Sequence, residues 1–194
     1  PVDRYGGGKI MRFERQRPIF GEEGQQRIMS SVVGVIGCGG LGVNLITQLT
    51  VAGVSHFILC DPGYPEPTDL NRQFIYSAGD MRPKAVISAE WILALNPTAD
   101  LQANSEPLSA DNHDLFSGCD IIVDCLNGGS SDLIANLVDI KKIPLVSLRT
   151  NGMRGEVSVI SPNNVSKLTG IDECEENHRL GAAVSAVASM GATE

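Results

Sequence analysis

Cations and amides gather in one short part of this sequence. Residues 69–73 read Asp-Leu-Asn-Arg-Gln, and a Pro-Lys pair follows at 83–84. Arg72 and Lys84 can neutralise phosphate oxygens, and the amides of Asn71 and Gln73 can hydrogen-bond to the same oxygens. This is more positive charge than a hydride-transfer site needs and about what the handling of a triphosphate requires. The pattern favours ATP over NAD as the ligand.

A glycine-rich turn stands before these residues. The apolar run 32–36 predicts a buried strand, and it leads into Gly37-Cys38-Gly39-Gly40-Leu41-Gly42. In such a turn Gly37 makes the tight bend, Gly39 lets the backbone approach phosphate oxygens, and Gly42 lets the following helix lie close to the sheet. Glycines at a strand-to-helix turn also serve ordinary packing, so the turn alone leaves a purely structural role open.

A second strand at 57–60 ends in Asp61, nineteen residues after Gly42. A carboxylate in this position can accept hydrogen bonds from ribose hydroxyls, while the start of the intervening helix, predicted over 43–52, offers N–H groups to a phosphate. The whole unit of strand, glycine turn, helix, strand and acid is typical of a nucleotide site.

The rest of the chain alternates strands with helices. We expect strands near 101–103, 121–124, 143–148 and from 156, and helices at 22–30, from Pro83 to 95, at 111–116, at 133–140 and from 181. This order predicts an α/β fold with a doubly wound, mainly parallel, Rossmann-like sheet. Asp61, Asp124 and Arg149 then fall at carboxyl ends of strands, where such sheets bind ligands. We expect one domain over 12–194, a flexible segment over 1–11 and a mobile loop over 161–179.

The composition limits the classes of partner that the chain can bind. The 194 residues carry a net charge of −8, which gives no basic field for nucleic acid or for an anionic membrane surface. Without a long apolar run or a signal-peptide core, the expected location is the cytoplasm. The five cysteines are odd in number and include no Cys-x-x-Cys pair, so we expect reduced thiols and no zinc. Cys174 stands among four acidic residues that should suppress its thiolate.

Several motifs occur together and in order. They are Arg12-Phe13-Glu14-Arg15-Gln16, the glycine turn, Asp61, Leu70-Asn71-Arg72-Gln73, Pro83-Lys84-Ala85, Leu95-Asn96-Pro97 and Asp124-Cys125. In this combination the chain resembles the ThiF/MoeB/HesA family of adenylating enzymes, which are related to ubiquitin-activating E1. The resemblance spans about residues 12–190.

The resemblance implies an adenylyltransferase that attacks ATP at its α-phosphorus with a carboxylate, giving an acyl-adenylate and pyrophosphate. By family analogy, the glycines 37, 39, 40 and 42 and Asp61 hold the nucleotide with Asn71. Arg72, Gln73 and Lys84 face the phosphates, and Asp124 holds Mg²⁺. Arg15 resembles the arginine that reaches into the partner's site in family homodimers.

Three departures from the family pattern stand out. Asp69 replaces an asparagine that many relatives have, Gly63 replaces a second aspartate, and residues 124–128 read Asp-Cys-Leu-Asn-Gly instead of Asp-x-x-Asp-Asn. Asp69 puts a negative charge near the phosphates, so either it turns away or a second cation offsets it. The paired cysteines of members that activate sulfur carriers are missing, and no cysteine is well placed as a transfer nucleophile.

Three functions fit these features. The first is adenylation of a small-molecule carboxylate, and here the compact outline resembles the ThiF-like enzyme of Fe-hydrogenase cofactor synthesis, which adenylates a guanylylpyridinol carboxylate; a downstream acyl-acceptor enzyme would then be a partner. The second is activation of the Gly-Gly terminus of a ubiquitin-like sulfur carrier, and the third is nucleotide binding without catalysis. Arg149 and Arg154 are either solvated loop arginines or ligands of an anionic group that the substrate carries beyond its reacting carboxylate.

Overall fold

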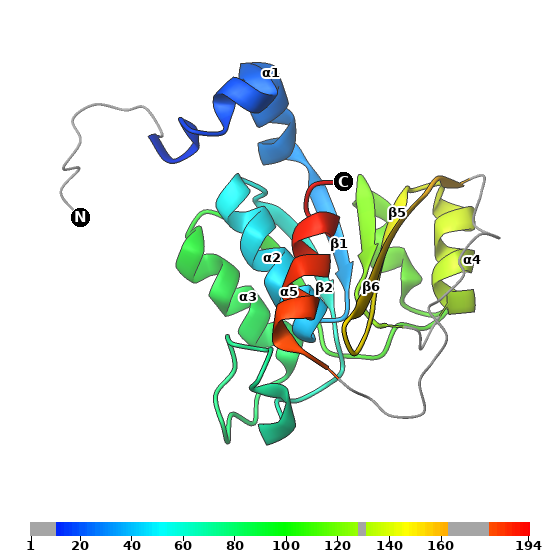
Figure 1. The fold of residues 1–194 in the computed structure, drawn as a ribbon. Helices are drawn as coiled ribbons and strands as arrows, with labels where there is room; N and C mark the ends of the chain where they lie inside the picture. Colours follow the sequence, from blue (N-terminus) through cyan, green and yellow to red (C-terminus); the bar gives the residue numbers. More distant parts are fainter. Residues whose placement is uncertain (1–10, 128–130, 163–178) are drawn as a thin grey trace.

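A twisted six-stranded sheet forms the centre of the molecule (Figure 1). The computed structural model describes residues 11–127, 131–162 and 179–194. The strand order is β3-β2-β1-β4-β5-β6, in which the first five are parallel and β6 runs antiparallel to β5. The strands are β1 (Val32–Ile36), β2 (His56–Cys60), β3 (Asp100–Asn104), β4 (Ile121–Asp124), β5 (Leu145–Asn151) and β6 (Arg154–Ile160). The predicted doubly wound, mainly parallel sheet is confirmed.

Helices cover both faces of this sheet. One face is covered by α2 (Gly40–Ala52), α3 (Lys84–Leu95) and α5 (Gly181–Gly191), and the other by α4 (Ser131–Lys141) and the 3₁₀ helix η3 (His113–Gly118). Two further 3₁₀ turns, η1 (Met11–Phe13) and η2 (Pro67–Asp69), flank them. The helix α1 (Arg17–Ser30) lies outside these layers, next to the start of β1 (Figure 1).

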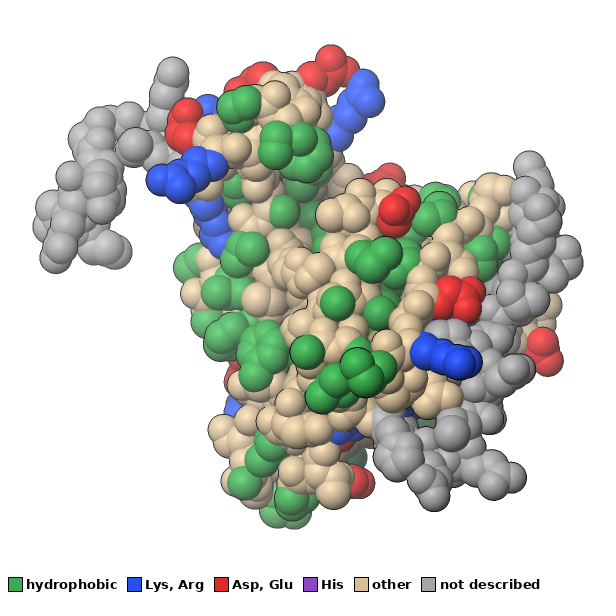
Figure 2. Space-filling view, viewed as in Figure 1, with side chains coloured by type: hydrophobic (Ala, Val, Ile, Leu, Met, Phe, Trp, Pro, Cys, Tyr) green, Lys and Arg blue, Asp and Glu red, His purple; other side chains and the backbone are tan. Residues whose placement is uncertain are grey.

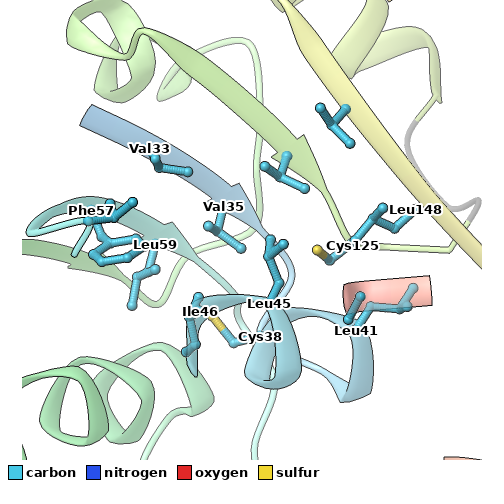
Figure 3. Close-up of a cluster of buried hydrophobic side chains, with 14 of the residues drawn as sticks. Val33, Val35, Cys38, Leu41, Leu45, Ile46, Phe57, Leu59, Cys125 and Leu148 are labelled. Atoms are coloured by element: carbon cyan, nitrogen blue, oxygen red, sulfur yellow. The ribbon is translucent and has the colours of Figure 1, made fainter. Parts of the chain in front are cut away.

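Alternating residues of the strands pack into two hydrophobic cores, one on each face of the sheet. Val33 and Val35 of β1 pack with Leu45 and Ile46 of α2, whereas Ile36 packs on the opposite side of the sheet. Because successive side chains of a strand point to opposite faces, a strand covered on both faces is apolar throughout. Figure 3 shows that the first core extends beneath the glycine turn, where the Cys38 side chain is buried.

Helix α5 lies very close to β5 and β6. A Cβ atom at Gly155 would overlap the Val187 side chain, and one at Gly191 would overlap the Leu148 side chain. The absence of these two side chains lets the helix backbone approach the sheet. The close contact fixes the start of α5 near the carboxyl ends of the strands.

The strand β5 differs from its predicted extent. It runs to Asn151 because residues 149–151 pair with 154–156 of β6 in a hairpin that turns at Gly152, where φ is 59°. Arg149 therefore lies inside a strand and does not follow it, and Arg154 is the first residue of β6. The hairpin extends an apolar strand by polar residues, and hydrophobic periodicity does not reveal such an extension.

Two helix starts also differ. The helix α1 begins at Arg17, before the predicted start at 22, and kinks at Gly21, where φ is 70°. Pro83 precedes α3 with a non-helical ψ of 143°, so Lys84 is the first helical residue. Lys84 nevertheless occupies the first turn, as predicted.

Some predicted features fall outside the described residues. They are residues 1–10 of the segment predicted to be flexible over 1–11, most of the loop at 161–179, and Cys174. No helix in the described part of the chain is both long enough and apolar enough to cross a bilayer.

Candidate functional site

A pocket of about 220 Å³ opens where β1 and β4 end. These strands mark the point at which the chain order of the sheet reverses, where doubly wound folds bind their ligands. The wall combines the glycine turn, the predicted cations, the segment after β4 and the end of β5. It consists of Gly39, Gly40, Leu41, Asp69, Arg72, Gln73, Lys84, Cys125, Leu126, Asn127, Thr150, Arg179 and Val184.

The glycine turn is held rigidly at the edge of this pocket. Gly37 has a φ of 97°, which only glycine adopts without strain, and a Cβ atom at Gly42 would overlap the Gly37 carbonyl oxygen. The Cys38 N–H donates to Asp61 Oδ2 at 2.6 Å, and its carbonyl accepts from the Tyr76 hydroxyl at 2.5 Å. The turn therefore presents the N-terminus of α2 to the pocket in a fixed position.

Asp61 has two backbone partners. Besides Cys38, the N–H of Gly63 donates to its Oδ1 at 2.7 Å. A Cβ atom at Gly63 would stand 2.9 Å from that oxygen, so a larger residue would crowd the carboxylate. This accounts for Gly63 in this chain. Asp61 anchors the turn and is not part of the pocket wall; its predicted bond to a ribose stays a prediction.

Asp69 is the centre of the cationic side of the pocket. Its Oδ1 accepts from Gln73 Nε2 at 2.7 Å and Arg72 Nη2 at 3.2 Å, and its Oδ2 accepts from Lys84 Nζ at 2.8 Å. The side chain is buried, so it does not turn away into solvent. Of the two alternatives that the sequence left open, the structure favours the second, in which cations offset the charge.

These contacts set the charge state of Asp69. Burial raises the pKa of its carboxyl, but the hydrogen bond and charge of Lys84 and the charge of Arg72 outweigh it, so the pKa lies below its usual value. Asp69 is thus ionised at neutral pH. One carboxylate then holds Arg72 and Lys84 in place, and the pocket wall keeps an excess of positive charge.

Asn71 supports the pocket wall from behind. Its Oδ1 accepts from Arg72 Nη1 at 2.8 Å, and its Nδ2 donates to the carbonyl of Arg179 at 3.2 Å. The side chain of Arg72 also donates to the Thr68 carbonyl. Asn71 therefore links the cationic loop to the segment before α5.

Asp124 and Arg149 form a buried pair beside the pocket. Arg149 Nη2 donates to Asp124 Oδ2 at 2.5 Å, and Asp124 Oδ1 accepts from the Leu126 N–H. We expected Arg149 and Arg154 at the mouth of the crevice. Arg149 instead points into the sheet, because the hairpin extends β5, and Arg154 is exposed at the start of β6; neither is part of the pocket wall.

Comparisons with known proteins agree with this geometry. A model described as the ThiF family matches residues 13–194. The chain belongs to the ThiF family. It is 33% identical over 156 residues to the adenylyltransferase and sulfurtransferase UBA4 of Yarrowia lipolytica, covering 78% of this chain and 39% of that protein. It is 32% identical over 159 residues to the vegetative HesA protein of Trichormus variabilis, covering 79% and 60%.

Further relatives and solved structures are consistent with this membership. The sulfur carrier protein ThiS adenylyltransferase of Escherichia coli is 29% identical over 158 residues, which cover 79% of this chain and 63% of that protein. A crystal structure of PaaA superposes with a TM-score of 0.79 at 20% identity, over 100% of this chain and 68% of that one. Escherichia coli MccB with ATP gives 0.76 at 18% identity, over 94% and 61%. The structural likenesses concern the fold.

Two residues of the pocket wall, Asn127 and Arg179, are not among the site residues predicted from the sequence. Asn127 adopts a φ of 61°, and its side-chain amide exchanges two hydrogen bonds with the Thr150 backbone. Arg179 Nη1 donates to the same Thr150 carbonyl at 2.5 Å. An Asn-Gly pair after a strand is a usable turn signal for Asn127. Arg179 follows a stretch without periodicity, and nothing in the sequence singles it out.

The described thiols are poor nucleophiles. Burial raises the pKa of Cys125, on the pocket wall, well above its usual value, and it raises that of Cys119 to about 12. The described cysteines, at positions 38, 60, 119 and 125, are all buried and free. Among the described residues, no three histidine, cysteine or acidic side chains gather in a way that could hold a metal ion.

Arg15 lies far from this pocket. It is exposed between η1 and α1, and the adjacent Gln16 donates to the carbonyl of Ala52 at the end of α2, whereas Gly40 at the start of α2 is on the pocket wall. The structure therefore does not bring Arg15 together with Arg72 and Lys84 within one chain.

Proposed function

We propose that this ThiF-family chain adenylates a carboxylate with ATP. The observation that carries the proposal is the pocket in which a rigid glycine turn meets Arg72 and Lys84 at the switch point of the sheet. Free N–H groups at a helix start and fixed cations are the groups that bind a polyphosphate. The names of relatives such as the UBA4 adenylyltransferase agree with this activity. The chain covers only 39% and 60% of the length of the first two relatives, so we infer its activity from its own site and not from theirs.

The proposed step needs no protein nucleophile. A carboxylate oxygen of the substrate forms a bond to the α-phosphorus of ATP, the bond from that phosphorus to the bridging oxygen breaks, and pyrophosphate leaves with the electron pair. Lys84 and Arg72 would neutralise the charge that grows on the leaving group, and Gly39 and Gly40 allow close approach of the backbone. Positioning and charge neutralisation are sufficient for this chemistry.

Asp124 remains the proposed ligand of Mg²⁺, although it is 0% exposed and is not part of the pocket wall. A carboxylate has about four acceptor positions, of which Arg149 and the Leu126 N–H use two, and Mg²⁺ bound to phosphates takes only one or two carboxylates with water. Asp124 would hold the ion as a hard oxygen ligand. When bound, Mg²⁺ would neutralise phosphate oxygens and help to orient the triphosphate.

We further propose a homodimer in which Arg15 acts in the partner's site. The distance of Arg15 from its own pocket supports an action across subunits. The face shown in Figure 2 carries exposed apolar side chains over α1, α2 and α5, which are Ile19, Phe20, Val51 and Met190. These apolar side chains would be covered if a second copy of the chain packed on this face.

The substrate that we favour is a small-molecule carboxylate, such as a guanylylpyridinol-type cofactor precursor. The Gly-Gly terminus of a ubiquitin-like sulfur carrier is the alternative, and the naming of a relative as a ThiS adenylyltransferase favours it. Under the first hypothesis a downstream enzyme would accept the acyl group.

ATP–pyrophosphate exchange tests the activity. Purified protein is incubated with ATP, Mg²⁺, labelled pyrophosphate and a panel of small carboxylates and carrier proteins. We expect label to enter ATP only with the cognate carboxylate, and Lys84→Gln to reduce exchange at least about 100-fold. Arg154→Gln, an exposed cation outside the pocket, should leave exchange unchanged. ATP binding without exchange for any carboxylate would instead favour a non-catalytic nucleotide-binding protein.

A further inference from the structure

Arg179 is held on the pocket wall by three segments of the chain. Its Nη1 donates to the Thr150 carbonyl at the end of β5, and its own carbonyl accepts from Asn71 Nδ2. Its backbone forms a bridge with Gly152 in the β5–β6 hairpin. The guanidinium is therefore fixed at the pocket and is not a freely moving surface cation.

The charge of Arg179 is not balanced by the described residues. Among the described residues, Asp69 is the one carboxylate on the pocket wall, and both Arg72 and Lys84 already bind to it. Within 11–127, 131–162 and 179–194, no acidic side chain pairs with Arg179. Burial and the nearby charge of Arg72 lower its pKa, yet a guanidinium stays charged at neutral pH. The wall thus holds a fixed cation that can pair with an anion.

The position of Arg179 separates it from the nucleotide half of the crevice. The glycine turn and Asp61 follow β1 and β2, whereas Asn127 follows β4 and Thr150 lies near the end of β5, on the other side of the switch point. In the proposed reaction the acyl substrate must approach the α-phosphorus from a side that the nucleotide does not fill. The half beyond β4 is that side.

We propose that Arg179 binds an anionic group of the acyl substrate other than the carboxylate that reacts. The ligand class is a carboxylate or phosphate, because a planar guanidinium can bind either through two parallel hydrogen bonds. This inference rests on the proposed adenylation. The sequence offered Arg149 for this role, but Arg149 is already paired with Asp124. Arg179 takes its place, although the sequence does not single it out.

Non-hydrolysable acyl-adenylate mimics test the proposal. Three 5′-O-(N-acylsulfamoyl)adenosines are compared, with butanoyl, succinyl and 3-phosphonopropanoyl as acyl parts, so that the chain ends in a methyl, a carboxylate or a phosphonate. Calorimetry on the wild-type protein should show that one or both anionic probes bind about 10- to 100-fold more tightly than the neutral one, as expected for a charged hydrogen bond. The tighter of the two anionic probes identifies the preferred anion.

Variants then assign the preference to Arg179. Arg179→Gln should reduce the difference between charged and neutral probes to less than threefold, with the Kd of the butanoyl probe nearly unchanged. Arg179→Lys should retain part of the difference, and Arg154→Gln all of it. Circular dichroism and thermal unfolding check that each variant is folded.

Other outcomes overturn the inference in distinguishable ways. Equal binding of all three probes by the wild-type protein, or equal weakening of all three in Arg179→Gln, would refute the anion subsite at Arg179. Neither result would contradict the proposed adenylation. Failure of the protein to bind either ATP or the butanoyl probe would overturn the proposed function, and this inference with it.

Discussion

Arg149 of β5 and Asp124 of β4 form an ion pair inside the sheet, with 2.5 Å between Nη2 and Oδ2. Arg149 is 4% exposed and Asp124 is 0% exposed. Burying two charges is costly, and the cost is offset only while both partners are present. The pair connects two neighbouring strands directly beneath the pocket, so it bears on the stability of the site as well as on its charge.

Replacing one member of this pair should destabilise the protein strongly. Arg149→Met leaves the Asp124 carboxylate buried without its partner, and we expect the free energy of unfolding to fall by about 3–5 kcal/mol. The double variant Arg149→Met/Asp124→Leu buries no unpaired charge and should lose less than the single variant. Urea denaturation measures both. A loss below about 1 kcal/mol for the single variant would mean that water or another group replaces Arg149.

Asp69→Asn should lower stability in a pH-dependent manner. Because the folded-state pKa of Asp69 lies below its unfolded value of about 3.9, the carboxylate contributes its full stability above that pH and loses it as the pH falls through the folded-state pKa. We expect a loss of about 1–3 kcal/mol at pH 7, since Lys84 and Gln73 lose an ionised acceptor, and a smaller difference from wild type below pH ~4. Denaturation at several pH values measures this. Exposed Asp111→Asn is the control, and a loss independent of pH would argue against the charge as its origin.

Gly42→Ala should disrupt the glycine turn. The added methyl group would overlap the Gly37 carbonyl oxygen, so the helix must move away from the turn. We expect at least about 1–3 kcal/mol of destabilisation and a marked loss of ATP affinity. Gly118→Ala is the matched control, because a Cβ atom there meets nothing within 4 Å. ATP titration and urea denaturation of both variants provide the comparison, and unchanged ATP affinity in a folded Gly42→Ala protein would refute the role of the turn.

The parts of the fold that the sequence predicts are those that depend on local pattern. An apolar run predicts a strand that is buried on both faces, and Val35 is indeed fully buried. The glycine spacing predicts a turn that leaves no room for side chains, and Gly37 has the positive φ that such a turn requires. Arg72, Gln73 and Lys84 could likewise be predicted as neighbours, since they belong to the one segment that joins β2 to the start of α3. All three do meet on the pocket wall.

What the sequence does not reveal depends on tertiary pairing. Arg149 looks like a residue beyond a strand until the hairpin with β6 extends that strand and turns the side chain toward Asp124. The role of Asp69 is set by three side-chain donors that converge only in the fold, and Arg179 comes to the pocket through the close packing of α5. Hydrophobic periodicity carries no information about contacts of this kind.

The last prediction concerns Arg15 and uses mixed dimers. If Arg15 acts in the partner's site, Arg15→Ala and Lys84→Gln chains each lack activity alone, yet a mixed dimer holds one site with Lys84 from one chain and Arg15 from the other. Random assortment makes about half of the dimers mixed, each with one intact site of two, so a 1:1 mixture should recover about a quarter of wild-type exchange activity. Lys84→Gln suits this test better than a change at Asp124, whose loss would leave Arg149 buried and unpaired. Arg27→Ala, an exposed arginine on the same helix region, is the control and should stay fully active. Native mass spectrometry establishes that mixed dimers form; if they form and remain inactive, Arg15 acts within its own subunit or not at all.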